Sequence, residues 1–267
     1  MTTIAQHDRR TIRDVLAREM VADVELLFFT QGSVGSAGAG PEDRQSCDET
    51  RELLDDLAAL SERLMVTAHD VSLDPARATA YNVRAVPTVI VQRRDLGRDV
   101  DNDPGIHDRG TDDAAERAAD DWLADNGQDA VGVTSGAATV RFLGLPSGYE
   151  FSALVADIID VSKGQTTLSA TTRELARAIT MPVHLQVFVT PNCPYCPPAA
   201  RVAHQLAMEN PLILADVIEA NEFHDLSERY RVQTVPKTVI NDRVEFVGAL
   251  PEAKVMEAVM EAVRRAG

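Results

Sequence analysis

The chain has 267 residues, of which 45% are apolar, and a formal net charge of −16 from 42 acidic and 26 basic residues. This length accommodates two domains with hydrophobic cores. The acidic balance argues against a general nucleic-acid binder, and no apolar run approaches the length of a membrane span.

The basic residues are almost all arginine, with lysine only at Lys163, Lys237 and Lys254. An acidic surface poor in lysine holds water and stays soluble at high salt. We interpret this composition as halophilic, which concerns solubility and not activity.

The N-terminal part of the chain predicts a helix, a strand and a loop. Residues 1–20 carry four arginines and no apolar run, which is typical of an amphipathic helix and not of a signal peptide. The protein is therefore expected in the cytoplasm. Residues 25–30 predict a strand. An insertion at about residues 31–43, rich in Gly, Ser and Ala, predicts a flexible loop.

A second insertion, at about residues 93–138, holds much of the acidic charge. From Asp95 to Asp129 the sequence has 12 acidic residues and 3 arginines, a net charge of −9. Such a composition predicts a mobile surface segment. Within it, residues 113–123 suit a short helix that contains Trp122, the single tryptophan.

Three elements are predicted between this insertion and the second half of the chain. Residues 139–143 predict a strand. Residues 150–161 predict a helix, because apolar residues recur on one side of it. Residues 171–179 suit a helix that leads into the second half. The apolar side of the middle element consists of Phe151, Leu154, Val155, Ile158 and Ile159.

The sequence Cys193-Pro194-Tyr195-Cys196 carries the clearest chemistry in the chain. It follows a β-branched and aromatic run, residues 183–190, and precedes residues 199–210, which predict a helix. Two thiols three residues apart on the first turn of a helix can close a small disulfide. The unpaired N–H groups of that turn favour a negative charge. We therefore expect Cys193 to have a lowered pKa and to attack as the thiolate.

The two halves of the chain repeat one pattern. Pro87 follows Cys47, and Pro236 follows Cys196, at the same distance of 40 residues. Both prolines lie in a similar sequence motif that begins with tyrosine, contains two valines and leads into a β-branched strand. A repeat of this length predicts two copies of one α/β domain. The first copy is incomplete, because Arg44 stands where the counterpart of the leading cysteine would be.

These patterns resemble the tandem protein disulfide oxidoreductases of archaea and thermophiles, also called glutaredoxin-like proteins. The resemblance implies an α/β fold of two tandem thioredoxin-like folds, each a mixed sheet flanked by helices, with the acidic insertion in the first. We expect residues 1–165 to form the first fold and residues 166–267 the second. The segments that match this family are Phe188–Pro197, Thr234–Lys237, Arg243–Phe246, Phe142–Pro146 and Glu150–Phe151.

The resemblance also implies dithiol–disulfide exchange at the cysteine pair. Cys193 would be the nucleophile and Cys196 the resolving thiol, and the redox-active disulfide between them would serve in place of a bound cofactor. Four further residues would support the site, among them a cis proline that faces the two cysteines. They are Pro194, Tyr195, Val235 and Pro236.

The first half is expected to hold a degenerate site made of Arg44, Cys47 and Pro87. Family members usually carry two complete pairs, so activities that need both are in doubt here. We interpret Cys47 as a buried helix cysteine. The alternative is a thiol that forms mixed disulfides alone, with its pKa lowered by Arg44. Pro87 is expected to keep a cis peptide bond.

Several polar residues have plainer interpretations. A structural zinc site needs four Cys or His ligands, and the chain has only three cysteines, so no metal is expected. His204 is interpreted as an ordinary helix residue. Asp70 and Glu219, each 17 residues before its proline, are either proton acceptors near the cysteines or simply polar strand ends.

Three functions remain compatible with the sequence. The first is exchange with protein disulfides, supplied with electrons by a thioredoxin-reductase-like flavoprotein. The second is a dedicated electron carrier to one peroxidase or reductase, with the first domain as docking module, similar to the N-terminal part of alkyl hydroperoxide reductase flavoproteins. The third is glutaredoxin-type small-thiol chemistry, because Thr234-Val235-Pro236 beside Cys-Pro-Tyr-Cys resembles glutaredoxins. Neither nucleic acid nor a membrane is an expected partner.

Overall fold

The computed structural model of the protein describes residues 4–31, 41–95 and 140–266. Most of the predicted loop at 31–43 lies outside these residues. The same is true of nearly all of the acidic insertion, including residues 113–123 and Trp122.

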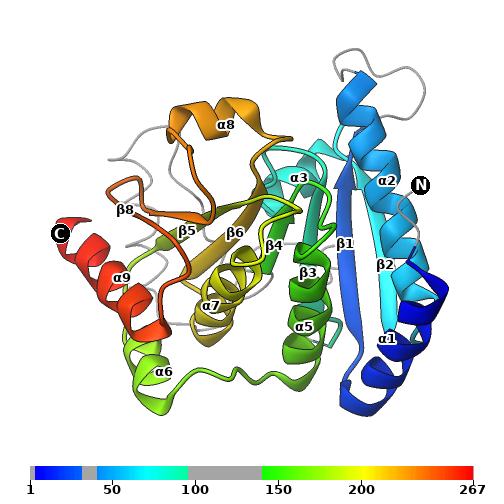
Figure 1. Cartoon of the computed structure of the whole chain (residues 1–267), viewed down its shortest axis with the longest axis horizontal. Coiled ribbons are helices and arrows are strands. Elements are labelled where there is room, and N and C mark those ends of the chain that lie inside the picture. Colours follow the sequence, from blue (N-terminus) through cyan, green and yellow to red (C-terminus); the bar gives the residue numbers. More distant parts are fainter. Residues whose placement is uncertain (1–3, 32–40, 96–139, 267) are drawn as a thin grey trace.

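One mixed sheet of eight strands runs through the described chain (Figure 1). Its order is β2-β1-β3-β4-β6-β5-β7-β8. The two halves therefore share a single sheet, joined where β4 pairs in parallel with β6. The strands are β1 (Val24–Thr30), β2 (Leu64–Asp70), β3 (Thr88–Arg93), β4 (Val140–Leu143), β5 (Val183–Val189), β6 (Ile213–Glu219), β7 (Lys237–Ile240) and β8 (Val244–Val247).

Helices cover both faces of this sheet. On one face α5 and α7 pack against each other and against the strands (Figure 1). The opposite face is covered by the short helices α3 and α8, whose neighbourhoods pack on Phe29 and Phe188. The helices are α1 (Gln6–Glu19), α2 (Pro41–Ala58), α3 (Pro75–Ala80), α5 (Glu150–Lys163), α6 (Ala170–Arg177), α7 (Cys196–Glu209), α8 (His224–Arg229) and α9 (Glu252–Ala266).

Burial on both faces explains the apolar run Leu26–Phe29 of β1. In β1, Leu26 and Phe28 belong to the core that contains α5 and α7 residues. Leu27 and Phe29 point the other way and pack with the α3 region, because successive side chains alternate across a strand. A strand enclosed on both sides has no polar face, which gives the continuous apolar run.

The repeat predicted from the sequence is present in three dimensions. Phe29 lies 5.6 Å from Tyr81 between ring centroids, and Phe188 lies 5.5 Å from Tyr230. The predicted α/β class with two tandem thioredoxin-like folds is confirmed. The boundary at residues 165 and 166 stays a prediction; it falls between α5 and α6. None of the described helices is long and apolar enough to cross a membrane.

The helices that carry the cysteines begin at different points of the repeat. In the first half α2 begins at Pro41, so Cys47 lies well inside it. In the second half α7 begins at Cys196 and Cys193 lies in the turn before it, so the expectation that both thiols lie on the first turn of the helix is wrong. The two cysteine positions that match in sequence therefore occupy different places along their helices.

Candidate active site

Cys193 and Cys196 form a disulfide at the start of α7, with Cα atoms 5.4 Å apart. The turn between them is closed by the Cys196 N–H, which donates to the Cys193 carbonyl (3.3 Å). Cys193 is 8% exposed and Cys196 is fully buried. The two sulfurs are therefore not equivalent, and an incoming thiol or disulfide reaches Cys193 more easily.

The start of α7 has fewer hydrogen-bond donors than expected from the sequence. Pro197 and Pro198 occupy the two positions after Cys196 and have no N–H. The N–H of Cys196 is already bonded to Cys193. The number of unpaired N–H groups at this helix start is therefore smaller than expected, and the alignment of the helical peptide dipoles adds positive potential there.

Both proline loops have the same construction. The Val86–Pro87 and Val235–Pro236 peptide bonds are cis, as expected for both halves. Gly144 donates its N–H to the Pro87 carbonyl (2.9 Å), and Gly248 donates its N–H to the Pro236 carbonyl (2.7 Å).

The other predicted site residues differ in exposure. Tyr195, between the cysteines, is 70% exposed; Pro194 is exposed and Val235 is half-buried. Their supporting roles stay predictions.

The first half has no cysteine three residues before Cys47. Cys47 is buried in α2, as expected, while the side chain of Arg44 is exposed on the same helix. Pro87 is buried directly before β3. Ser46, next to Cys47, donates a hydrogen bond to Glu222 of the second half. Whether the Cys47 thiol reacts stays a prediction.

A segment of the first half, residues 144–150, lies against the active-site loop of the second half. The N–H of Tyr149 donates to the Pro191 carbonyl (2.9 Å). Gly148 has φ +60°, and a Cβ atom on it would lie 2.2 Å from the same carbonyl oxygen. Only glycine allows this approach. The first half therefore forms one side of the loop that precedes Cys193.

Glu150, the first residue of α5, is a buried acid that was not selected from the sequence. It is 2% exposed, and neither carboxyl oxygen has a hydrogen-bond partner among the described residues. Burial, together with the charges of Asp157 and Glu219, raises its pKa to about 8. In the sequence it looked like an ordinary acid at a helix start. The available signal was its place in Glu150–Phe151, one of the segments that match the family.

The two candidate acids at strand ends have different surroundings. Glu219 is buried at the end of β6, and burial raises its pKa. It accepts hydrogen bonds from Asn221 Nδ2 (2.8 Å) and from the Glu222 N–H (2.7 Å). Asp70 is half-buried and accepts from the Ser72 N–H, as a polar strand end does.

A buried polar cluster joins α5 to α7. Arg201 pairs with Asp157 and Asp160. His204 is fully buried; its Nδ1 lies 2.7 Å from Asp157 and its Nε2 lies 3.1 Å from the Arg141 carbonyl. His204 is therefore a bridge between the halves, and the expectation of an ordinary helix residue is wrong.

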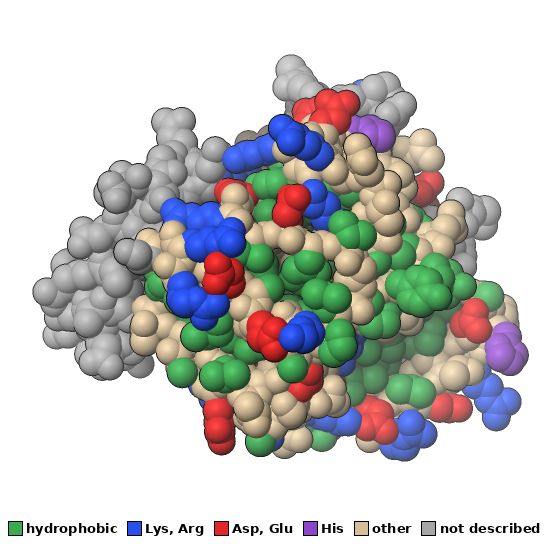
Figure 2. Space-filling view, turned by 60° about the vertical axis from the view of Figure 1, so that its left-hand side comes forward, with side chains coloured by type: hydrophobic (Ala, Val, Ile, Leu, Met, Phe, Trp, Pro, Cys, Tyr) green, Lys and Arg blue, Asp and Glu red, His purple; other side chains and the backbone are tan. Residues whose placement is uncertain are grey.

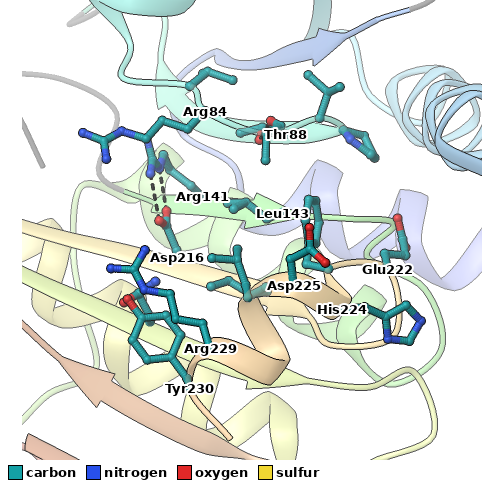
Figure 3. Close-up of a pocket in the computed structure, with 18 of the residues that line it drawn as sticks. Arg84, Thr88, Arg141, Leu143, Asp216, Glu222, His224, Asp225, Arg229 and Tyr230 are labelled. Carbon is teal, nitrogen blue, oxygen red and sulfur yellow. Dashed lines mark hydrogen bonds and ion pairs between the residues drawn. The ribbon is translucent and has the colours of Figure 1, made fainter. Parts of the chain in front are cut away.

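A cavity of about 620 Å³ opens between the halves on the face of the sheet that α3 and α8 cover (Figure 3). Arg141 at its floor pairs with Asp216 through two hydrogen bonds of 2.6 and 2.8 Å. His184 Nε2 also lies 2.8 Å from Asp216. Although burial acts in the opposite direction, Arg141 and His184 lower the pKa of Asp216. The disulfide does not line this cavity.

No group of three or more His, Cys, Asp or Glu side chains within residues 4–31, 41–95 and 140–266 is arranged to hold a metal ion.

Sequence comparisons place the second half among thioredoxins. The thioredoxin domain family model matches residues 183–261. The thioredoxin of Methanocaldococcus jannaschii is 36% identical over 78 residues, which is 29% of this chain and 92% of that protein. The alkyl hydroperoxide reductase protein AhpF of Pseudomonas aeruginosa is 25% identical over 120 residues, 45% of this chain. The chain spans only 23% of the length of this second relative.

Structural comparison extends the similarity to the whole chain. The crystal structure of a protein disulfide oxidoreductase from Aeropyrum pernix matches with a TM-score of 0.73 at 26% identity, over 98% of this chain and 94% of that one. The alkyl hydroperoxide reductase protein AhpF of Enterococcus faecalis has the same fold, with a TM-score of 0.71 at 19% identity over 96% of this chain and 99% of that one.

Fold and site together define a dithiol–disulfide oxidoreductase with the redox pair Cys193–Cys196. The second half has the thioredoxin fold that carries the pair, and the first half is a copy of the same fold without it. The chain belongs to the thioredoxin family, in its tandem group of protein disulfide oxidoreductases.

Proposed function

We propose that the protein exchanges its Cys193–Cys196 pair with disulfides of protein substrates in the cytoplasm. The observation that carries this proposal is the unequal burial of the two cysteines. The Cys193 thiolate attacks one substrate sulfur, forms a mixed disulfide and releases the other sulfur as a thiolate. Cys196 then attacks Cys193 Sγ, releases the second substrate thiolate and closes the Cys193–Cys196 disulfide. Two electrons pass from the dithiol to the substrate.

Glu150 is the proposed proton acceptor for Cys196. The second step requires Cys196 to lose a proton although it is fully buried. Helix α5, which begins at Glu150, packs against α7, which begins at Cys196. A carboxyl with a pKa of about 8 matches a thiol, whose ordinary pKa is about 8.5. Proton transfer between such groups is nearly balanced in free energy, which suits general base catalysis.

The disulfide itself is the redox group in this proposal, so each cycle needs an external electron donor. A dithiol of a thioredoxin-reductase-like flavoprotein is the proposed donor, because the disulfide must receive two electrons before the next attack. The supporting residues Pro194, Tyr195, Val235 and Pro236 surround the cysteines in sequence or in the cis-proline loop. They are proposed to shape the contact with the substrate.

A trapping experiment tests this assignment. In a Cys196→Ser variant the mixed disulfide at Cys193 cannot be resolved, so substrate proteins stay attached to the chain. We expect disulfide-linked complexes in lysate that disappear on reduction and are absent from a Cys193→Ser variant. Complexes trapped by Cys193→Ser but not by Cys196→Ser would reverse the assigned roles.

A second candidate function is electron transfer to one dedicated partner, with the first half as docking module. The observation that favours it is the similarity in sequence to the alkyl hydroperoxide reductase protein AhpF. The aligned segment has 120 residues, which is longer than the second half of this chain. The same trapping experiment separates the two candidates. One dominant mixed-disulfide partner favours the dedicated carrier, and many partners favour the general exchange of protein disulfides.

A further inference from the structure

Large apolar side chains that remain exposed are few in the described chain, and half of them belong to or adjoin residues bonded to the active-site loop or the cis-proline loop of the second half. Tyr195 stands between the two cysteines. Val247 precedes Gly248, which bonds to the Pro236 carbonyl. Tyr149 precedes Glu150 and bonds to the Pro191 carbonyl. Figure 2 shows one face of the molecule, on which hydrophobic patches lie among acidic and basic side chains. The whole set is Val21, Leu73, Tyr149, Leu175, Tyr195 and Val247.

Tyr149 differs from Tyr195 and Val247 because it comes from the first half of the chain. Its backbone is fixed beside the active-site loop by the hydrogen bond to Pro191 and by the close approach of Gly148. On its other side, Ser152 donates both its N–H (3.1 Å) and its Oγ (2.7 Å) to the Tyr149 carbonyl. Tyr149 is nevertheless 51% exposed, so much of its ring faces solvent.

We propose that Tyr149 contacts the polypeptide whose disulfide reacts with Cys193, and that it is a specificity determinant supplied by the first half. This inference rests on the proposed function. An aromatic side chain with a fixed backbone and few rotatable bonds loses little conformational entropy on binding. Tyrosine is also among the residues that most often dominate interface energies.

The geometry favours a polypeptide over a small disulfide as the occupant. To react, a substrate sulfur must reach Cys193, which is almost buried in its turn. A polypeptide that covers this point extends over the neighbouring surface, where Tyr149 and Tyr195 are exposed. A small disulfide has no atoms beyond the reacting sulfurs and their short substituents. Tyr149 therefore contributes to the reaction with proteins and not to the reaction with small disulfides.

The experiment uses the full-length protein in its reduced form, with the reductant removed. Second-order rate constants are measured by quenched alkylation with two oxidants, insulin and bis(2-hydroxyethyl) disulfide. We expect Tyr149→Ala to slow the reaction with insulin about five- to tenfold, the effect of a typical interface residue. The reaction with the small disulfide stays within twofold. Tyr149→Phe keeps most of the rate with insulin, because the ring is retained.

Leu73→Ala is the matched control, because Leu73 is 77% exposed just after β2, at the far end of the sheet from β5. It leaves both rates unchanged. Equal slowing of both oxidants by Tyr149→Ala overturns the inference in favour of a structural role, as does no slowing at all. A change in oligomeric state in that variant overturns it in favour of a contact between copies. If the wild-type dithiol reduces only the small disulfide, the proposed function itself fails.

Discussion

His204 and Asp157 share a buried hydrogen bond of 2.7 Å that joins the second half of the chain to the first. The other ring nitrogen of His204 faces the Arg141 carbonyl at 3.1 Å. A carbonyl and a carboxylate only accept hydrogen bonds. His204 thus links Asp157 of α5 to the backbone of β4, and Arg201 supplies a positive charge beside Asp157.

Removal of the Asp157 charge is expected to destabilise the fold. In Asp157→Asn, Arg201 loses one of its two partners and His204 loses its carboxylate, while both remain buried or nearly so. Breaking a buried pair costs about 3–5 kcal/mol, measured as the free energy of unfolding in urea. Asp55→Asn is the control, since it removes an exposed pair with Arg51 that is worth at most about 1 kcal/mol. Equal losses in the two variants contradict the prediction.

Glu150 is expected to make the fold less stable as the pH rises. Its pKa is about 8 in the folded chain, against 4.5 for the free group. Between these values the unfolded chain has released the proton and the folded chain has kept it, so stability falls through this window and levels off above pH 8. Glu150→Gln has no such group, so its unfolding free energy exceeds that of the wild type by on the order of 4 kcal/mol at pH 9.

Urea unfolding of both proteins from pH 4 to pH 9 checks this prediction. Below pH 4.5 the difference between the two is small, because Glu150 is protonated in both states. Glu174→Gln, which changes an exposed acid of α6, follows the wild type throughout. A constant difference at every pH would show that Glu150 does not titrate as described.

Alanine substitutions at Gly148 and Gly164 form a matched comparison that tests the contact between the first half and the active-site loop. Their φ angles are +60° and +61°, so alanine carries the same backbone strain at both. Only at position 148 does a Cβ atom meet backbone, the Pro191 carbonyl, at 2.2 Å; at 164 the nearest atom is the end of the Arg93 side chain at 3.0 Å.

Gly148→Ala is therefore expected to cost about 1–3 kcal/mol more than Gly164→Ala, the range for overpacking. It also slows the reaction of reduced Cys193 with a small disulfide, because the loop before Cys193 must move. Unfolding and stopped-flow alkylation measure the two effects. If the two alanine variants behave alike, the contact at Pro191 has no influence on the site.

Cys47→Ser is expected to leave disulfide exchange within twofold of the wild type, whereas Cys193→Ser abolishes it. Cys47 lies inside α2, is buried and has no neighbouring cysteine three residues before it. The variant loses about 1–2 kcal/mol of stability from burying a hydroxyl. Insulin reduction and urea unfolding give the two readouts. Loss of insulin reduction in Cys47→Ser alone would reverse the assignment of the halves.

The sequence was sufficient where local pattern determines structure. The similar sequence motifs around Pro87 and Pro236 identified the duplicated fold, and the spacing of Cys193 and Cys196 identified the redox pair. The insertions hid the different helix starts of the two halves, because the first helix begins at Pro41 and not at a cysteine. The number of donors at the start of α7 was misjudged because the two prolines after Cys196 were not considered.

The buried polar residues were missed for another reason. Glu150 and Asp157 lie three or four residues from buried apolar positions of α5 such as Leu154 and Val161. Acids on the buried stripe of a helix require partners from another element, and this signal was readable. The partners of Asp157 on α7, Arg201 and His204, were not readable, because they depend on how the two halves pack.

The pairing of β4 with β6 has a consequence for isolating the catalytic half. A chain that starts after α5 resembles a single-domain thioredoxin in length, yet it loses the strand that covers one edge of β6. It would present an open row of backbone donors and acceptors and leave Asp216 without Arg141. The strand β4 of the first half thus shields an edge of the half that carries the redox pair.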